Sequence, residues 1–169
     1  ALPISSGQVN FCGEDIGHLS SREISRKGMA RTFQHVKMIP DMTVLENVAL
    51  GTYLRTSSGS LAAMLRLDRG EERRALAEAM RQLQRIGMAD FVDELAGNLA
   101  LGPQRLMEIA RALSLDARVL IMDEPTAALS QREVERLFTV VNDLRQHGVA
   151  MMFVGHRMDE IFRIADRIA

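Results

Sequence analysis

Apolar residues at the amino-terminal end of the chain follow the spacing of strands. Residues 8–13 alternate between apolar and polar side chains like a half-buried strand, and residues 29–33 could form a second short strand. Between them, residues 20–28 predict a short polar helix that ends at Gly28. This part of the chain is therefore expected to contain strands and one short helix.

The middle of the chain carries the spacing of helices instead. Residues 41–43 offer capping side chains for a helix whose apolar positions follow directly. Residues 52–70 contain a serine- and glycine-rich stretch and look like a flexible insert. Residues 71–86 predict a helix that ends at Gly87, and another is expected from about residue 104 to 114. This arrangement suggests a helical insertion in an α/β domain.

Two apolar strands separated by an amphipathic helix are expected in the last third. Residues 119–123 form a continuous apolar run that ends at Asp123, which is typical of a parallel strand buried on both faces. Residues 132–146 predict the helix, and residues 149–154 predict the second strand. The order strand, helix, strand implies a right-handed parallel crossover.

A parallel crossover brings the carboxyl ends of both strands to one edge of the sheet, where α/β sheets bind ligands. We therefore expect Asp123, Glu124 and His156 to lie close together. Asp followed by Glu suits a metal–nucleotide site, because Asp can hold Mg²⁺ and Glu can orient or deprotonate a water. From these residues alone, an acidic turn after a strand is the other interpretation.

Composition excludes a few classes of protein. A hydrophobic content of 47% over 169 residues fits a globular domain, and a formal charge of -1 gives no general attraction to nucleic acid. The single Cys12 excludes an internal disulfide and a cysteine-based metal site. No apolar run reaches the roughly 18 residues of a membrane span, so any membrane role is expected to be peripheral.

Five segments, in order, resemble the motifs of the nucleotide-binding subunit of ATP-binding cassette (ABC) transporters. They are residues 32–34 as the glutamine loop, 99–105 as the signature, 119–123 as the Walker B motif with Glu124 as catalytic glutamate, 127–130 as the dimer-contact loop, and His156 as the switch histidine. The resemblance covers essentially the whole chain.

The resemblance implies an α/β, P-loop NTPase-like fold with a mostly parallel sheet and a helical subdomain insertion, incomplete at the amino terminus. It divides the chain into residues 1–35, part of the core up to the glutamine loop, and residues 36–115, the helical subdomain with the signature. Residues 116–169 then form the part of the core with Walker B and the switch histidine.

The resemblance also implies roles for the site residues, with ATP and Mg²⁺ as cofactors. Asp123 would hold Mg²⁺ directly or through water, and Gln34 would reach the metal and the attacking water. Glu124 would act as the catalytic base, and His156 would contact the γ-phosphate and sense its loss. Further nucleotide-binding positions are Leu99, Ala100, Gly102, Gln104 and Ser130.

The signature departs from its usual form, Leu-Ser-Gly-Gly-Gln. Ala100 stands at the serine position and Pro103 at the glutamine position, whereas Gly102 keeps the second glycine. A hydroxyl donor to the γ-phosphate is lost, so Gly102 and the positive helix N-terminus remain as an anion site. Ser130 likewise replaces the usual aspartate of the dimer loop. We expect ATP to be sandwiched less tightly than in the family at large.

The phosphate-binding loop, Walker A, is absent from the sequence. Lys27 and Lys37 are the only lysines, and neither lies in a Gly-x-x-x-x-Gly-Lys-Ser/Thr motif, whose backbone N–H groups and lysine hold the phosphates. The simplest interpretation is an amino-terminal truncation. We expect this chain alone to bind ATP poorly and to be inactive.

The expected function is that of an ATPase fragment that energises a bacterial importer at the cytoplasmic face of the inner membrane. Its partners would be permease subunits, reached through the helical subdomain, and a second ATP-binding subunit in a homo- or heterodimer; no nucleic acid is expected. Residues 31–36, 42–48 and 99–102 resemble branched-chain amino-acid importers, whereas residues 119–129 and 156–162 resemble sugar importers. We favour the amino-acid type. A sugar-importer ATPase and a non-catalytic ABC-like interaction module are the alternatives.

Overall fold

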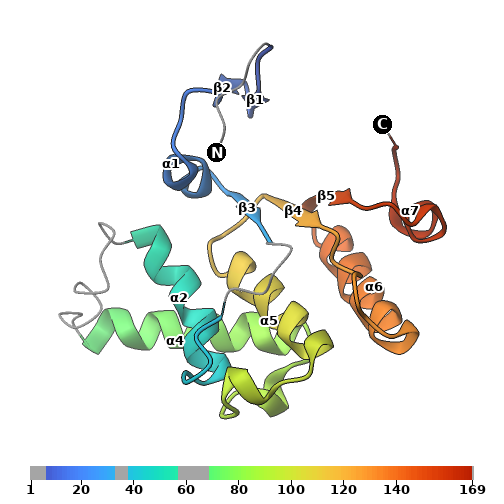
Figure 1. The fold of residues 1–169 in the computed structure, drawn as a ribbon. Coiled ribbons are helices and arrows are strands. Elements are labelled where there is room, and N and C mark those ends of the chain that lie inside the picture. Colours follow the sequence, from blue (N-terminus) through green and yellow to red (C-terminus); the bar gives the residue numbers. More distant parts are fainter. Residues whose placement is uncertain (1–6, 33–37, 57–68, 169) are drawn as a thin grey trace.

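The computed structural model describes residues 7–32, 38–56 and 69–168. These residues form an α/β structure around a three-stranded parallel sheet, ordered β3-β4-β5 (Figure 1). The strands are β3 (Met29–Arg31), β4 (Val119–Asp123) and β5 (Ala150–Val154). Both pairings are parallel, with β4 between the other two. The expected α/β fold with a parallel sheet is confirmed.

The crossover from β4 to β5 is the element that builds the sheet edge. Helix α6 (Gln131–Gln146) connects the two strands, close to the predicted bounds, and residue Gly148 with φ +80 follows its end. In the resulting register Asp123 lies opposite Val154. The backbone N–H of Glu124 donates to the carbonyl of Val154 at 2.8 Å, which carries the ladder one step beyond the strand.

The amino-terminal segment differs from the single strand predicted over residues 8–13. It forms a small antiparallel hairpin of β1 (Asn10–Phe11) and β2 (Glu14–Asp15). Between them Cys12 and Gly13 both have positive φ, 52° and 83°, which is the backbone of a two-residue hairpin turn. The predicted short helix is present as α1 (Ser21–Arg26), closed by Gly28 with φ +96.

Three helices of the middle region pack against one another: α2 (Val44–Thr56), α4 (Arg69–Arg85) and α5 (Leu101–Leu113). Figure 1 shows them grouped below the sheet, with α5 on the side that faces α6. Two short 3₁₀ turns, Ala89–Phe91 and Ala96–Asn98, connect α4 to α5.

The helix ends follow local side-chain chemistry. Thr43 caps α2, since its Oγ1 accepts from the N–H of Glu46 at 3.2 Å and the Glu46 carboxylate accepts from the N–H of Thr43 at 2.7 Å. This agrees with the predicted cap, although α2 continues to Thr56, into the predicted insert. Helix α5 begins three residues earlier than predicted, and Pro103 lies in its first turn, where a helix tolerates proline.

The apolar run of β4, expected to be buried on both faces, is fully buried on one face and half-buried on the other, where Val119 and Ile121 lie. Leu120 and Met122 are fully buried. Phe153, beside Met122 on β5, contacts Phe138 of α6 edge-on, with 6.4 Å between the ring centroids. On the other face of β5, Met152 is 56% exposed and Val154 46% exposed. Helix α6 packs on the face of the sheet that carries Phe153. Helix α7 (Met158–Ile164) follows β5.

Within the three described ranges, no helix combines the length and the apolar character that crossing a bilayer requires.

Because the two faces of the sheet differ in burial, we expect the same substitution to change the free energy of unfolding by different amounts on each face. Met122→Ala should lower the free energy of unfolding by about 2–5 kcal/mol, because Met122 is fully buried and a cavity would remain. Met152→Ala, the matched control, should change it by less than about 0.5 kcal/mol. Urea unfolding measures both values. Equal losses at the two positions would contradict the assignment of the buried face.

Candidate functional site

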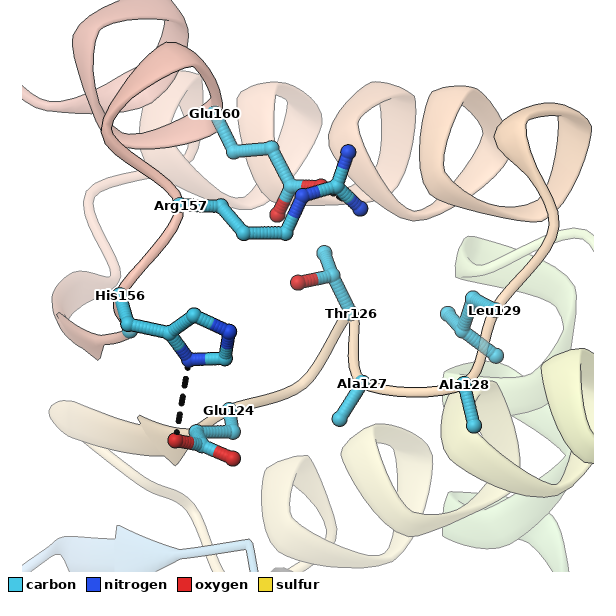
Figure 2. A pocket seen from close by; sticks show the side chains of 9 residues that line it. Glu124, Thr126, Ala127, Ala128, Leu129, His156, Arg157 and Glu160 are labelled. Carbon is cyan, nitrogen blue, oxygen red and sulfur yellow. Dashed lines mark hydrogen bonds and ion pairs between the residues drawn. The ribbon is translucent and has the colours of Figure 1, made fainter.

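The carboxyl ends of β4 and β5 bring two predicted catalytic residues into contact. Nδ1 of His156 lies 3.2 Å from Oε1 of Glu124, although the two residues are 32 positions apart (Figure 2). When Nδ1 carries the proton, it donates to the carboxylate and leaves Nε2 of the ring as an acceptor. The predicted convergence of these side chains is therefore observed.

The backbone at Glu124 is unusual for a residue with a side chain. Its φ of 46° lies in the left-handed region, and Ala128 in the following loop has φ 62°. The N–H of Ala127 donates to the carbonyl of Glu124 at 3.1 Å, which closes a tight turn directly after the strand. This turn aims the Glu124 carboxylate at His156 instead of along the direction of β4.

Asp123, the residue before, is held by a cation from the neighbouring strand. Nη2 of Arg31, the last residue of β3, lies 2.6 Å from Oδ2 of Asp123. The Arg31 side chain is 60% exposed and that of Asp123 25%. Sequence reasoning missed Arg31, because its contact with Asp123 depends on the β3–β4 register across 92 residues.

A cleft of about 240 Å³ opens beside the Glu124–His156 pair. Its lining comes from the turn after β4 and from the segment after β5: Glu124, Thr126, Ala127, Ala128, Leu129, Gly155, His156, Arg157 and Glu160. Figure 2 shows Arg157 and Glu160 on the side of the cleft opposite Glu124. The buried Glu160 carboxylate lies 2.5 Å from the Arg157 guanidinium, so the two charges compensate each other.

The signature segment lies outside this cleft. Ala100 is the N-cap of α5 and, as expected from the lost hydroxyl, makes no side-chain cap. Gln104 folds back, and its Nε2 donates to the carbonyl of Leu99 at 2.8 Å. None of Leu99, Ala100, Gly102 and Gln104 lines the cleft that contains Glu124.

Gly102 and Ser130 are joined through a residue that sequence reasoning missed. Oε1 of Glu133 accepts from the N–H of Gly102 at 3.1 Å. Oε2 accepts from the N–H of Ser130 at 2.8 Å and from its hydroxyl at 2.6 Å. The Ser130 hydroxyl, then the Ser130 and Gly102 N–H groups, lower the pKa of the Glu133 carboxyl below its usual value. The spacing Ser-x-x-Glu before an apolar helix was the available signal for the capping part.

Gln34, the remaining predicted site residue, lies outside the described residues. The structure thus groups the other predicted residues into two sets. Asp123, Glu124 and His156 meet at the sheet edge, and the signature residues gather at the start of α5 near Ser130.

The donor chemistry at Asp123 fits Mg²⁺. In the described ranges no cluster of three or more His, Cys, Asp or Glu side chains is placed to hold a metal. Mg²⁺ in nucleotide sites commonly takes one or two carboxylates and completes its shell with phosphate oxygens and water. The Asp123 side chain is 25% exposed and contacts the Arg31 guanidinium, so a carboxylate oxygen is accessible at the sheet edge.

Comparison with known proteins identifies the family. A family model described as ABC transporter matches residues 1–127, three quarters of the chain. The ribose import ATP-binding protein RbsA of Bacillus licheniformis is 39% identical over 165 residues, which are 98% of this chain and 32% of that protein. RbsA of Chromobacterium violaceum is 41% identical over 166 residues, 97% of this chain and 31% of that protein. The chain spans about a third of the length of these relatives.

Solved structures agree with this family. A nucleotide-free ATP-binding cassette from an ABC transporter superposes with a TM-score of 0.83 at 28% identity, over 98% of this chain and 65% of that one. The ADP conformation of the cassette MJ1267 gives 0.81 at 28% identity, with 98% and 65% covered. The chain belongs to the ABC transporter family, and its α/β fold is that of an ABC cassette.

The Arg31–Asp123 ion pair is expected to be weak enough to give way to another cation. In a double-mutant cycle of Arg31→Gln and Asp123→Asn, the coupling energy should be about 0.2–1 kcal/mol, because Arg31 is largely exposed and solvent screens the pair. Urea unfolding at low and high salt measures it, and salt should reduce it. A coupling above about 2 kcal/mol would instead make the pair a fixed structural bridge.

Proposed function

We propose that this chain is part of the ATP-binding protein of an ABC importer for a sugar. In this proposal Asp123, Glu124 and His156 form the metal-and-water half of its ATP site. The observation that carries it is the Glu124–His156 contact at 3.2 Å, directly beside Asp123 at the carboxyl edge of the parallel sheet. Such an edge is where open α/β sheets bind their ligands.

Each of the three residues has a role that its position supports. Hydrolysis of a phosphoanhydride needs positioning and charge stabilisation more than covalent catalysis, and Mg²⁺ supplies much of the charge. Asp123 would exchange the Arg31 guanidinium for the metal. Glu124, fixed by its turn, would accept a proton from the attacking water, and His156 would orient Glu124 and face the terminal phosphate. Gln34 would reach the metal and the attacking water.

The second half of the proposal concerns the other subunit. Leu99, Ala100, Gly102, Gln104 and Ser130 would face a nucleotide held by a second ATP-binding subunit. Their position outside the cleft of Glu124 and His156 supports this division of labour. The helices of residues 36–115 would contact permease subunits, and residues 1–35 and 116–169 would form the core. These partners would place the protein at the cytoplasmic face of the membrane.

The relatives change the expected cargo. The sequence analysis favoured branched-chain amino acids, but the relatives at 39% and 41% identity are named ribose import proteins. The amino-acid type is not confirmed, and the sugar-importer alternative is the better supported one. The resemblance of residues 119–129 and 156–162 to sugar importers agrees with it.

Substitution of the proposed base tests the site. In the complete natural protein, Glu124→Gln should lower ATP turnover by about 10²–10⁴-fold while ATP binding is retained, because the amide cannot accept the proton. Phosphate release and equilibrium nucleotide binding measure the two effects. The control Glu72→Gln, at an exposed position of α4, should leave turnover unchanged. Wild-type turnover in Glu124→Gln would remove Glu124 from this role.

Uptake by cells tests the cargo. Deletion of the gene should abolish uptake of labelled ribose or a related sugar and leave leucine uptake intact, and the wild-type gene should restore sugar uptake. Restoration by the Glu124→Gln gene would show that transport does not depend on this site. Loss of leucine uptake with normal sugar uptake would return the assignment to the amino-acid type.

A further inference from the structure

The Glu133 carboxylate links two helices at their amino-terminal ends. It belongs to the first turn of α6, yet one of its oxygens accepts from Gly102 in the first turn of α5 at 3.1 Å. Its other oxygen accepts twice from Ser130, at 2.8 Å and 2.6 Å. The contact therefore joins the predicted signature segment to the predicted dimer-contact loop.

Only a carboxylate of this length satisfies all three donors. Both of its oxygens act as acceptors, and two of the donors are backbone N–H groups, which cannot reverse their role. In a glutamine side chain one of the two ends would be an amide NH₂ that faces a backbone N–H. An aspartate is one methylene shorter, so it can cap Ser130 but cannot also extend to Gly102.

The space at Gly102 is matched to this contact. A Cβ built on Gly102 would lie 2.4 Å from Oε1 of Glu133 and 2.8 Å from its Cδ and Cγ. Gly102 lies in the first turn of α5, and glycine has a lower helix propensity than alanine. The absent side chain thus allows the carboxylate to approach the helix start, at the expense of helix propensity.

We propose that Glu133 is a positioning residue that fixes the first turn of α5 against residues 126–130. The two segments that would face the nucleotide of a second subunit then keep a constant spacing and move as one body. In this structure the N–H of Gly102 donates to Glu133, and the missing side chain of Gly102 leaves room for the carboxylate. The role in turnover rests on the proposed function, whereas the contact itself does not.

A stability cycle in the complete natural protein tests the contact without reference to activity. Gly102→Ala alone should lower the melting temperature by roughly 2–4 °C, since its Cβ would displace the Glu133 side chain and break its hydrogen bond to Gly102. In a Glu133→Ala background the same substitution should not lower it, because the collision is gone and alanine favours the helix. An equal loss in both backgrounds would overturn the contact.

A kinetic experiment tests the positioning role. Glu133→Asp keeps the negative charge at the start of α6 but loses the hydrogen bond to Gly102. We expect kcat to fall about tenfold or more, because the first turn of α5 would no longer be held in place. The KM for ATP should stay within about twofold, since Glu133 does not line the cleft of Glu124 and His156. Glu135→Asp, on the same helix and paired with Arg163, should leave kcat unchanged.

The outcomes separate the two proposals. If the wild-type protein hydrolyses ATP and Glu133→Asp retains its kcat, the positioning role is wrong while the proposed function stands. If the wild-type protein shows no ATP turnover, the proposed function fails and the role in turnover fails with it. The melting-temperature cycle still decides in that case whether Glu133 and Gly102 are coupled.

Discussion

The parallel pairing of β4 with β5 is the constraint on which the candidate site depends. It sets Asp123 opposite Val154, and the bond from the Glu124 N–H to Val154 extends the ladder to the residue that turns away from the strand. His156 leaves β5 two residues after Val154, so the same register delivers its ring to Glu124. A slip of one residue would reverse the faces of β5 and separate the pair.

Strong periodicity made much of the fold predictable from the sequence. The β4–α6–β5 crossover was predicted with bounds close to those observed, because apolar runs and helical spacing over many residues leave few alternatives. The hairpin at Cys12–Gly13 was not predicted, since it follows from two backbone angles that the apolar pattern does not encode. Residues 119–123 were expected to be buried on both faces, but only Leu120 and Met122 are fully buried, because an apolar run shows a preference for burial and not which neighbours are present to provide it.

The sequence predicted those parts of the candidate site that strand order brings together. It did not predict the contacts that long side chains make between distant residues. Strand order alone brought Asp123, Glu124 and His156 to one edge. The Arg31–Asp123 and Glu133–Gly102 contacts join residues 92 and 31 positions apart through charged groups with several rotatable bonds. The sequence shows at most the local part of such contacts. The Ser130-x-x-Glu133 spacing indicates the bond between these two residues, but not the bond from Glu133 to Gly102.

The left-handed backbone at Glu124 favours glycine, whereas the proposed reaction needs a carboxylate at this position. A residue with a Cβ pays roughly 1–2 kcal/mol to hold φ at 46°, and glycine would adopt the same turn without this cost. The residue that best stabilises the turn is thus different from the residue that can accept a proton there. The fold therefore carries local strain at the position where we propose hydrolysis to occur, and the rigid ladder to Val154 is what sustains it.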